Sequence, residues 1–134
     1  MSPRYLLDTN ICIYIRQERP PAVRARFARQ AAGSVVMSVI TWGELLFGAK
    51  HSAARDAALE KLQRIAAQIP VLPLPLDAAE HYGDIRAHLT AAGQLIGAND
   101  LWIAAHARAE RLTIVTHNVD EFRRVPGLLV EDWL

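Results

Sequence analysis

The sequence of 134 residues contains one cysteine, two lysines and no apolar run that approaches the roughly 20 residues of a membrane span. The single cysteine, Cys12, excludes a disulfide within the chain, and its apolar neighbours predict a core position. The first residues lack the apolar segment and cleavage site of a signal peptide. We therefore expect no membrane association and a cytoplasmic location.

An excess of charge of one sign is also lacking, because 15 basic and 14 acidic residues leave a net charge of +1. The overall charge therefore gives no argument for nucleic-acid binding. The arginines are nevertheless unevenly distributed, and one fourteen-residue segment contains five of them: Arg16, Arg19, Arg24, Arg26 and Arg29. Arginine binds phosphate in a bidentate way, so this segment either contacts an RNA backbone or forms a solvated helix face.

The composition, 51% hydrophobic and 22% charged, is that of a globular protein with one hydrophobic core. Short β-rich runs alternate with longer helical patterns, which indicates an α/β sandwich. The runs are almost continuously apolar, as in parallel strands covered by helices on both faces. We predict a single domain over residues 1–134 with strands at Tyr5–Asp8, Val35–Ser38, Val71–Leu74, Thr113–Thr116 and Leu128–Glu131.

Helical patterns separate most of these strands. Thr9 or Asn10 is expected to cap the first helix, and Asn118 with Glu121 fits a capping box for a short helix after the fourth strand. Gly93 predicts the end of the helix that Asp77 caps. The longer helices are expected at Ile11–Arg16, after Pro20-Pro21, at Ile40–Ala49, at Ala53–Ile69, from Asp77 to Ala92, and at Gly97–Glu110.

Three acidic residues need explanation. Asp8 ends a strand, where ligands bind in open α/β sheets, although a turn with a capping side chain explains it equally well. Glu44 lies on an apolar helix face with no base at i±3 or i±4, and the adjacent Gly43 indicates close backbone approach. Asp100 is in the first turn of its helix, where the macrodipole alone also favours a carboxylate.

Thr116 and Asn118 follow a later strand and are expected at the same edge of the sheet as Asp8. Carboxylates that converge there repel one another by about 4 kcal/mol per pair at 4 Å and an effective dielectric of 20. A divalent cation would offset this repulsion. Oxygen ligands suit Mg²⁺ or Mn²⁺ rather than zinc, and the histidines have no metal-type spacing.

Four segments stand in a distinctive order and spacing: YLLDTNICIYI, SVITWGELLFGA, IGANDLWIAAHA and IVTHNVDEFRRVPGLLVEDW. Together they resemble the PIN-domain family and, within it, the VapC toxins of bacterial toxin–antitoxin pairs. The resemblance covers nearly the whole chain. It implies a PIN-like three-layer α/β/α sandwich around a parallel sheet, with Mg²⁺-dependent endoribonuclease activity that inhibits translation and growth.

By position, Asp8, Glu44 and Asp100 match the family's three acidic metal-site residues, and Thr116 matches its Ser/Thr after the fourth strand. Many members carry a fourth acid where this chain has Asn118, and the nearby Asp120 and Glu121 are out of register. The resemblance implies that Mg²⁺, replaceable by Mn²⁺, activates a water for attack on an RNA phosphodiester. Thr116 and Asn118 would orient water or metal, and the products would be a 5′-phosphate and a 3′-hydroxyl.

The resemblance also implies partners: a second copy of the chain and a cognate VapB-type antitoxin, whose C-terminal segment blocks the acidic site in a hetero-oligomer. A phosphoacceptor receiver domain is a poor alternative, because it needs a lysine after a late strand and both Lys50 and Lys61 fall on predicted helices. A haloacid-dehalogenase-type phosphatase would need Asp at position 10, which is Asn10. A PIN-like module that binds RNA or protein without catalysis remains the alternative.

Overall fold

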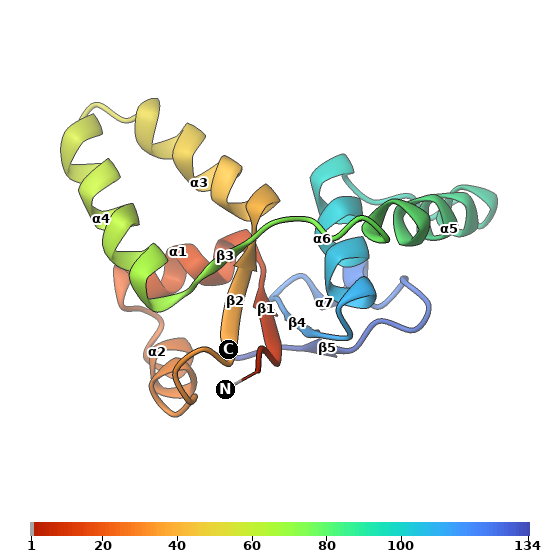
Figure 1. The fold of residues 1–134 in the computed structure, drawn as a ribbon, viewed down its shortest axis with the longest axis horizontal. Helices are drawn as coiled ribbons and strands as arrows, with labels where there is room; N and C mark the ends of the chain where they lie inside the picture. Colours follow the sequence, from red (N-terminus) through yellow and green to blue (C-terminus); the bar gives the residue numbers. More distant parts are fainter. Residues whose placement is uncertain (1) are drawn as a thin grey trace.

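The computed structural model describes residues 2–134, in which five parallel strands form one sheet in the order β3-β2-β1-β4-β5 (Figure 1). Leu6 of the central strand pairs with Val36 on one side and with Ile114 on the other. The strands are β1 (Tyr5–Leu7), β2 (Val35–Ser38), β3 (Val71–Leu72), β4 (Thr113–Val115) and β5 (Val130–Glu131). The predicted parallel α/β architecture is confirmed.

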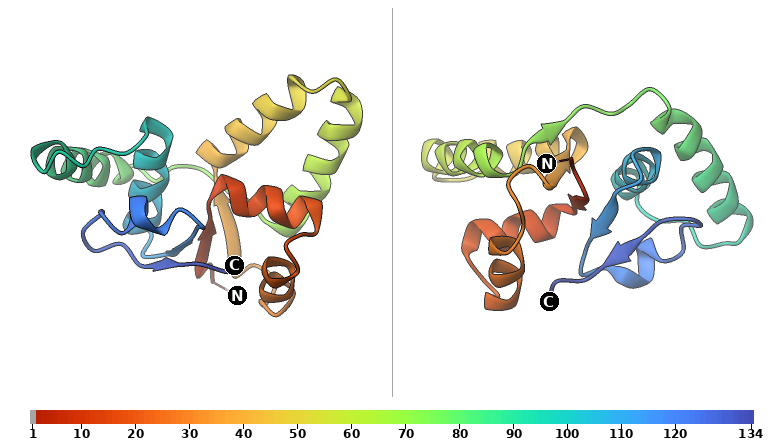
Figure 2. Two further views of the ribbon diagram at one scale, coloured as in Figure 1. Left: turned by 180° about the vertical axis from the view of Figure 1, so that it is seen from behind. Right: turned by 60° about the horizontal axis from the view of Figure 1, so that its bottom comes forward.

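Helices cover both faces of this sheet (Figure 2). Because neighbouring residues of a strand point to opposite faces, Tyr5 and Leu7 pack with the core under α1 to α4, whereas Leu6 packs with the core under α5 to α7. The three layers are therefore confirmed as well. The helices are α1 (Thr9–Gln17), α2 (Pro21–Ala28), α3 (Val39–Lys50), α4 (Arg55–Gln68), α5 (Ala78–Ala91), α6 (Ala98–Ala109) and α7 (Val119–Phe122).

The order of the strands creates a switch point beside β1. The chain moves outward from β1 to β2 and β3, then returns to place β4 on the other side of β1. The connections at the carboxyl ends of β1 and β4 therefore diverge to opposite faces, which leaves a crevice between them. Asp8 and Thr116 follow these two strands directly.

Several predicted boundaries are wrong for local reasons. Asp8 is not the last residue of β1 but the N-cap of α1, and its side chain accepts from the Thr9 N–H, so neither Thr9 nor Asn10 is the cap. Strand β3 ends at Leu72 because Pro73 has no N–H for the ladder. Strand β5 is likewise shorter than predicted.

The predicted end of α5 is confirmed, whereas two predicted caps are wrong. Gly93 has φ +66°, and the Gln94 N–H donates to the Leu89 carbonyl as in a Schellman motif. Asp77 precedes α5 but makes no capping hydrogen bond with its side chain. Asn118 precedes α7 without capping it either, so the capping box with Glu121 does not form.

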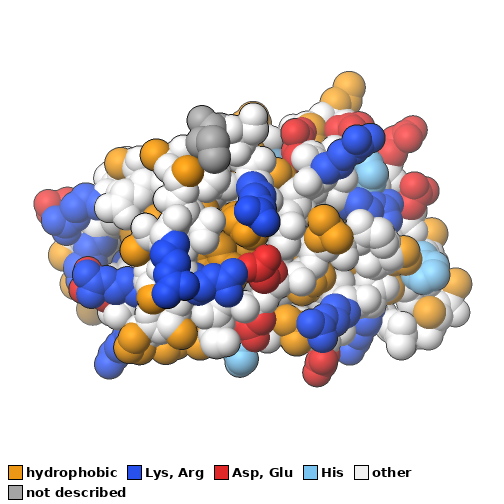
Figure 3. Space-filling model, turned by 90° about the horizontal axis from the view of Figure 1, so that it is seen from below, with side chains coloured by type: hydrophobic (Ala, Val, Ile, Leu, Met, Phe, Trp, Pro, Cys, Tyr) orange, Lys and Arg blue, Asp and Glu red, His pale blue; other side chains and the backbone are white. Residues whose placement is uncertain are grey.

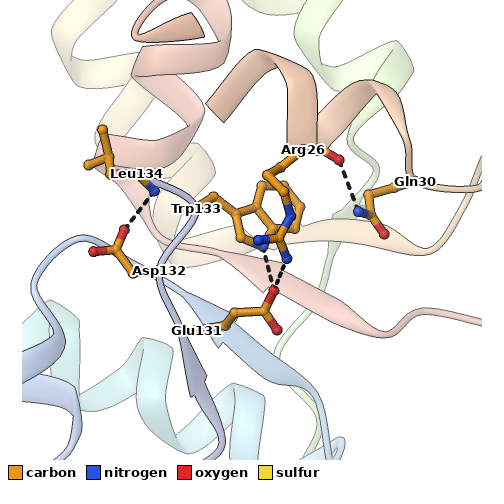
Figure 4. A network of polar contacts seen from close by, with 6 residues as sticks. All are labelled: Arg26, Gln30, Glu131, Asp132, Trp133 and Leu134. Carbon is orange, nitrogen blue, oxygen red and sulfur yellow. Dashed lines mark hydrogen bonds and ion pairs between the residues drawn. The ribbon is translucent and has the colours of Figure 1, made fainter. Parts of the chain in front are cut away.

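A cluster of three side chains, the C-terminal ion-pair cluster, fastens α2 to the end of the chain (Figure 4). Arg26 forms an ion pair with Glu131, and the guanidinium lies 5.6 Å from the Trp133 ring centroid. The Trp133 indole N–H donates to Glu131 at 2.9 Å. The ring, 1% exposed, packs edge-on against Tyr5. Arg26 is therefore bound to residues near the C-terminus of the same chain.

The surroundings of Cys12 and the length and hydropathy of the helices bear on two expectations from the composition. Cys12 is buried in the core as predicted, and burial raises the pKa of its thiol. Among residues 2–134, no helix is both long enough and apolar enough to cross a membrane.

Candidate functional site

Asp8 is held at the carboxyl edge of the sheet by two hydrogen bonds. Its Oδ1 accepts from the Thr9 N–H at 2.7 Å, and its Oδ2 accepts from the Thr116 hydroxyl at 2.9 Å. Thr116 is fully buried and Asp8 is 6% exposed. The end of β4 therefore fixes the carboxylate that follows β1, as the shared position of these residues predicted.

Glu44 reaches the same place from α3. Its Oε1 accepts from the Thr9 hydroxyl at 2.7 Å, and the Thr9 and Thr41 hydroxyl oxygens lie 3.3 Å apart. The expected close-packed face is wrong, since Phe47 and Gly48 at i+3 and i+4 are exposed, and the partner of the half-buried Glu44 is a hydroxyl from α1 rather than a base. Thr9, predicted as a helix cap with an additional role at the metal site left open, is not the cap and links Glu44 to Asp8.

Asp100 and Asn118 complete the arrangement through Glu121. The Asn118 N–H donates to the Thr116 hydroxyl at 2.9 Å, and the Asn118 side chain contacts the Glu121 carboxylate. The Asp100 carboxyl lies near these groups, because the charges of Asp8, Glu121 and Glu44 raise its pKa. The structure therefore joins Asp8, Glu44, Thr116 and Asn118 in one hydrogen-bonded network and places Asp100 beside it. We call the four neighbouring carboxylates, Asp8, Glu44, Asp100 and Glu121, the acid centre.

Glu121 is the residue that sequence reasoning missed. Its position three residues after Asn118 fits a capping box, and this local pattern concealed its position near Asp100, whose pKa it raises. The signal available in the sequence was the shortness of the segment, since an apolar and acidic run of four residues has little helix to cap.

Burial and mutual repulsion both disfavour the ionised forms of the carboxylates Asp8 and Asp100 in the acid centre. Burial is the main cause that raises the pKa of Asp8, and the charges of Glu44 and Glu121 raise it further, while its two hydrogen bonds act in the opposite sense. Burial, then the charge of Asp8, then Glu121 raise the pKa of Asp100 to about 7. Near neutral pH, Asp100 is therefore protonated part of the time.

The donor set fits a hard divalent cation. It consists of carboxylate oxygens with neighbouring hydroxyl and amide groups, and none of the four ion pairs found among residues 2–134 involves Asp8, Glu44, Asp100 or Glu121. Mg²⁺ and Mn²⁺ prefer such oxygen donors and would offset the repulsion. Within the described residues, however, no three acidic, His or Cys side chains converge closely enough to enclose an ion as they stand.

A buried hydrogen bond connects the two helices that carry Glu44 and Asp100. Ser38, which caps α3, lies 2.8 Å from His106 Nδ1 of α6, and both side chains are fully buried. His106 Nε2 has no partner in the described structure, and burial lowers the pKa of this imidazole. The bond fixes α3 against α6 beneath the acid centre.

The five arginines of the predicted basic segment have different surroundings. Arg26 is held in the C-terminal ion-pair cluster, and Arg24 lies 3.9 Å from Glu18 on the surface. Only Arg16 lines a groove that also contains Glu44, while Arg19 and Arg29 are exposed. On the face shown in Figure 3, a row of neighbouring basic side chains crosses the left half and ends against acidic side chains near the centre.

The predicted close approach of backbone at Gly43 is wrong. A Cβ at this position would meet no atom within 4 Å, so the space above Gly43 is open. Gly43 lines a groove together with Glu44 and Asn99.

Comparisons with known proteins identify relatives of this chain. Residues 5–128 match the family model described as PIN domain. The chain is 42% identical to the tRNA(fMet)-specific endonuclease VapC of Shigella flexneri, over 97% of this chain and 98% of that protein. It is 40% identical to the ribonuclease VapC2 of Haemophilus influenzae, with 98% of each chain covered.

Solved structures of toxin–antitoxin complexes match equally well. The VapBC complex of Salmonella typhimurium bound to DNA superimposes with a TM-score of 0.92 at 37% identity, over 98% of this chain and 99% of that one. VapBC2 of Rickettsia felis, bound to a DNA fragment from its promoter, gives 0.91 at 32% identity over the whole of both chains.

Proposed function

Because this chain belongs to the PIN-domain family, we propose that it is a VapC-type ribonuclease, the toxin of a toxin–antitoxin pair, which hydrolyses RNA phosphodiester bonds and thereby inhibits translation. The observation that carries the proposal is the arrangement at the carboxyl edge of the sheet, where hydrogen bonds join Asp8, Glu44, Thr116 and Asn118, with Thr9 between Asp8 and Glu44, and Asp100 lies beside them. The relatives named ribonuclease and endonuclease support it.

Asp8 and Asp100 would hold the cation, Mg²⁺ or Mn²⁺, with Glu44 contributing directly or through water. When bound, the cation lowers the pKa of a coordinated water and offsets charge on the phosphoryl oxygens. The protein residues provide position. Thr116 fixes one oxygen of Asp8, and Thr9 fixes Glu44.

The burial of Asp8 and Thr116 makes this position rigid. A carboxylate that stays in place before the substrate arrives needs no reorganisation in the transition state, and such preorganisation is a large source of electrostatic catalysis. Asn118 is exposed, so its amide is accessible to substrate or water as well as to Glu121.

The activity test uses purified protein, a mixture of cellular RNAs and Mn²⁺. Asp8→Asn should reduce cleavage by roughly 100-fold or more, because the several kcal/mol that a metal contributes to the transition state are lost. Asp77→Asn is the matched control, since Asp77 is exposed and makes no capping bond. Undiminished cleavage by Asp8→Asn would refute the proposed mechanism.

Metal binding separates the enzyme from an inert module of the same fold. Calorimetric titration with Mn²⁺ should give binding by the wild type and weaker or no binding by Asp8→Asn. A wild-type protein that binds no Mn²⁺ and cleaves no RNA would favour the module that only binds RNA or protein.

We propose a VapB-type antitoxin as partner and expect a homodimer within the hetero-oligomer. The support is that the structural relatives are toxin–antitoxin complexes. Co-expression with the product of the adjacent upstream reading frame should yield a stable complex whose RNA cleavage is inhibited. Its molar mass, measured by light scattering, gives the stoichiometry.

A further inference from the structure

An open groove extends from the acid centre between α3 and α6. This α3–α6 groove has a volume of about 590 Å³ and is lined by Thr9, Ile40, Gly43, Glu44, Phe47 and Asn99. Thr9 and Glu44 also belong to the network described above, so the groove begins at the site itself. Its size falls within the range of ligand pockets, roughly 300–1,000 Å³.

Phe47 is the unusual residue of this groove. Its side chain is 71% exposed, although burial of a phenylalanine is worth roughly 1.5–3 kcal/mol. It lies one helical turn after Glu44, and the imidazole of His51 stacks on it with an interplanar angle of 10° and 5.6 Å between centroids. The open space above Gly43 leaves the neighbouring part of the groove without a side chain.

Asn99 contributes the polar group of the same groove from the first turn of α6. Its amide carries both donors and an acceptor, which are the groups that read the edge of a nucleobase. An aromatic ring beside such an amide is the chemistry by which proteins bind unpaired RNA bases.

A second groove leaves the acid centre in another direction, between α1, α3 and α4. It has a volume of about 420 Å³, shares Thr9 and Glu44 with the first groove, and contains the cationic side chains Arg16 and Lys61. Neither cation takes part in an ion pair found among the described residues. Positive charge in one groove and an exposed aromatic ring in the other complement a phosphodiester strand that passes over the acids.

We propose that Phe47 is a stacking platform for an unpaired RNA base next to the scissile phosphate, and that Asn99 contacts the edge of that base. The proposal rests on the proposed ribonuclease function and adds a base-binding subsite to it. A protein segment docked on the exposed ring is the competing occupant, and the experiment separates the two.

Binding is measured first, in the Asp8→Asn background, so that the result does not depend on cleavage. The probe is a single-stranded oligonucleotide with 2-aminopurine at successive positions, whose fluorescence is quenched on stacking. Asp8→Asn protein should quench the probe at one position, and the additional Phe47→Ala change should weaken binding by about 5- to 100-fold, the equivalent of one base–aromatic stack. Phe47→Tyr should restore quenching, whereas Phe47→Leu should not, because it keeps an apolar side chain but no aromatic face.

Cleavage is measured second, with an otherwise native Asp8. Phe47→Ala should lower kcat/KM by the same factor, and an abasic residue at the stacked position should remove the difference between Phe47→Ala and wild type. Leu129→Ala is the control, because Leu129 is also an exposed apolar residue, at 63%, but lines neither groove. Because Phe47 is exposed, its variants should keep the wild-type unfolding midpoint.

The outcomes are distinguishable. Quenching and binding that do not depend on Phe47 overturn the subsite, as does an absence of RNA binding by Asp8→Asn protein. Normal RNA binding by Phe47→Leu would assign the ring to a protein interface instead. A Phe47→Ala change that alters only the molar mass of the protein or of its antitoxin complex would lead to the same assignment. Loss of cleavage in Asp8→Asn with full cleavage in Phe47→Ala leaves the ribonuclease function standing and removes only the subsite.

Discussion

The C-terminal ion-pair cluster and the acid centre are both built from carboxylates at the sheet, but only the first contains its own positive charge. Glu131 has Arg26 and the Trp133 indole as partners. Asp8, Glu44 and Glu121 have hydroxyl or amide partners, Asp100 lies near their charges, and none of the four has an ion pair among the described residues. A cluster with a counter-charge stabilises the fold, whereas one without it is suited to bind a cation or a substrate.

Substitutions in the two clusters should differ most in their effect on catalysis. Asp100→Asn should reduce RNA cleavage by roughly 100-fold or more, because it removes a carboxylate from the proposed cation site. Glu131→Gln makes the same chemical change in the C-terminal ion-pair cluster and should leave cleavage within about twofold. Initial rates with Mn²⁺ test the pair, and a similar loss in both variants would contradict the distinction.

A positive charge placed within the acid centre should make it resemble the C-terminal ion-pair cluster, which contains its own counter-charge, and should weaken cation binding. The Asn118 side chain contacts Glu121, so Asn118→Lys brings an ammonium group near the carboxylates. Mn²⁺ affinity should then fall by roughly 10- to 100-fold, comparable to the loss of a residue that orients a metal ligand. Calorimetry measures this affinity.

The control for that experiment is His117→Lys, which adds the same charge one residue away. The His117 ring lies 3.1 Å from Asp132 rather than beside the acid centre. Its Mn²⁺ affinity should stay close to that of wild type. An equal loss in both variants would show that the net charge of the protein, and not its position, determines cation binding.

The sequence predicted the acid centre better than the C-terminal ion-pair cluster. The difference depends on how far apart in the chain the contacting residues lie. Asp8, Asp100, Thr116 and Asn118 were identified because the ends of parallel strands and the first turns of the following helices meet at one edge of a sheet. Glu44 was identified because a carboxylate on an apolar helix face lacked a nearby base, and the resemblance to PIN domains assigned the metal-site roles. Strand identity and helix ends were predicted by local apolar patterns, with errors of one or two residues at caps and prolines.

The contacts that the sequence did not predict join residues far apart in the chain. Arg26 was assigned to a basic segment by its neighbours, but its partner Glu131 lies 105 residues away. Thr9 was assigned to a cap, but its hydroxyl bonds Glu44, 35 residues away. Glu121 satisfied a local capping pattern and was therefore not recognised as a neighbour of Asp100. A local explanation was sufficient for Arg26, Thr9 and Glu121, and Glu44 alone lacked one, but its sequence neighbours did not identify Thr9 as its partner.

Stability should respond to changes in the C-terminal ion-pair cluster. Arg26→Met and Glu131→Gln should each lower the free energy of unfolding by about 1 kcal/mol, because the pair is half-exposed but supported by the indole hydrogen bond. A double-mutant cycle by urea unfolding isolates the coupling between the two side chains. A coupling energy of zero would mean that the ring of Trp133, not the ion pair, fastens α2.

The smallest effect should be on the pH dependence of the free energy of unfolding, and it should arise in the acid centre alone. The pKa of Asp100 is about 7 in the folded protein, above its ordinary value of 3.8. Between these values the folded state retains a proton that the unfolded state releases, so Asp100 makes the metal-free protein less stable as pH rises. Above pH 7 both states are deprotonated and the penalty is constant. Asp100→Asn removes it.

The stability advantage of Asp100→Asn over wild type should therefore widen from pH 4 to pH 7 and then stay level. Urea unfolding in EDTA at several pH values measures this difference, and Leu129→Ala, which changes no titrating group, should show no such widening. Partial exposure of Asp100 reduces the size of the effect but not its sign. Added Mn²⁺ should reverse it, because a cation that binds the ionised carboxylate favours the folded state most where Asp100 has lost its proton. An advantage that is constant across this range would mean that Asp100 is already ionised in the folded protein, and that the acid centre tolerates its charge without a bound cation.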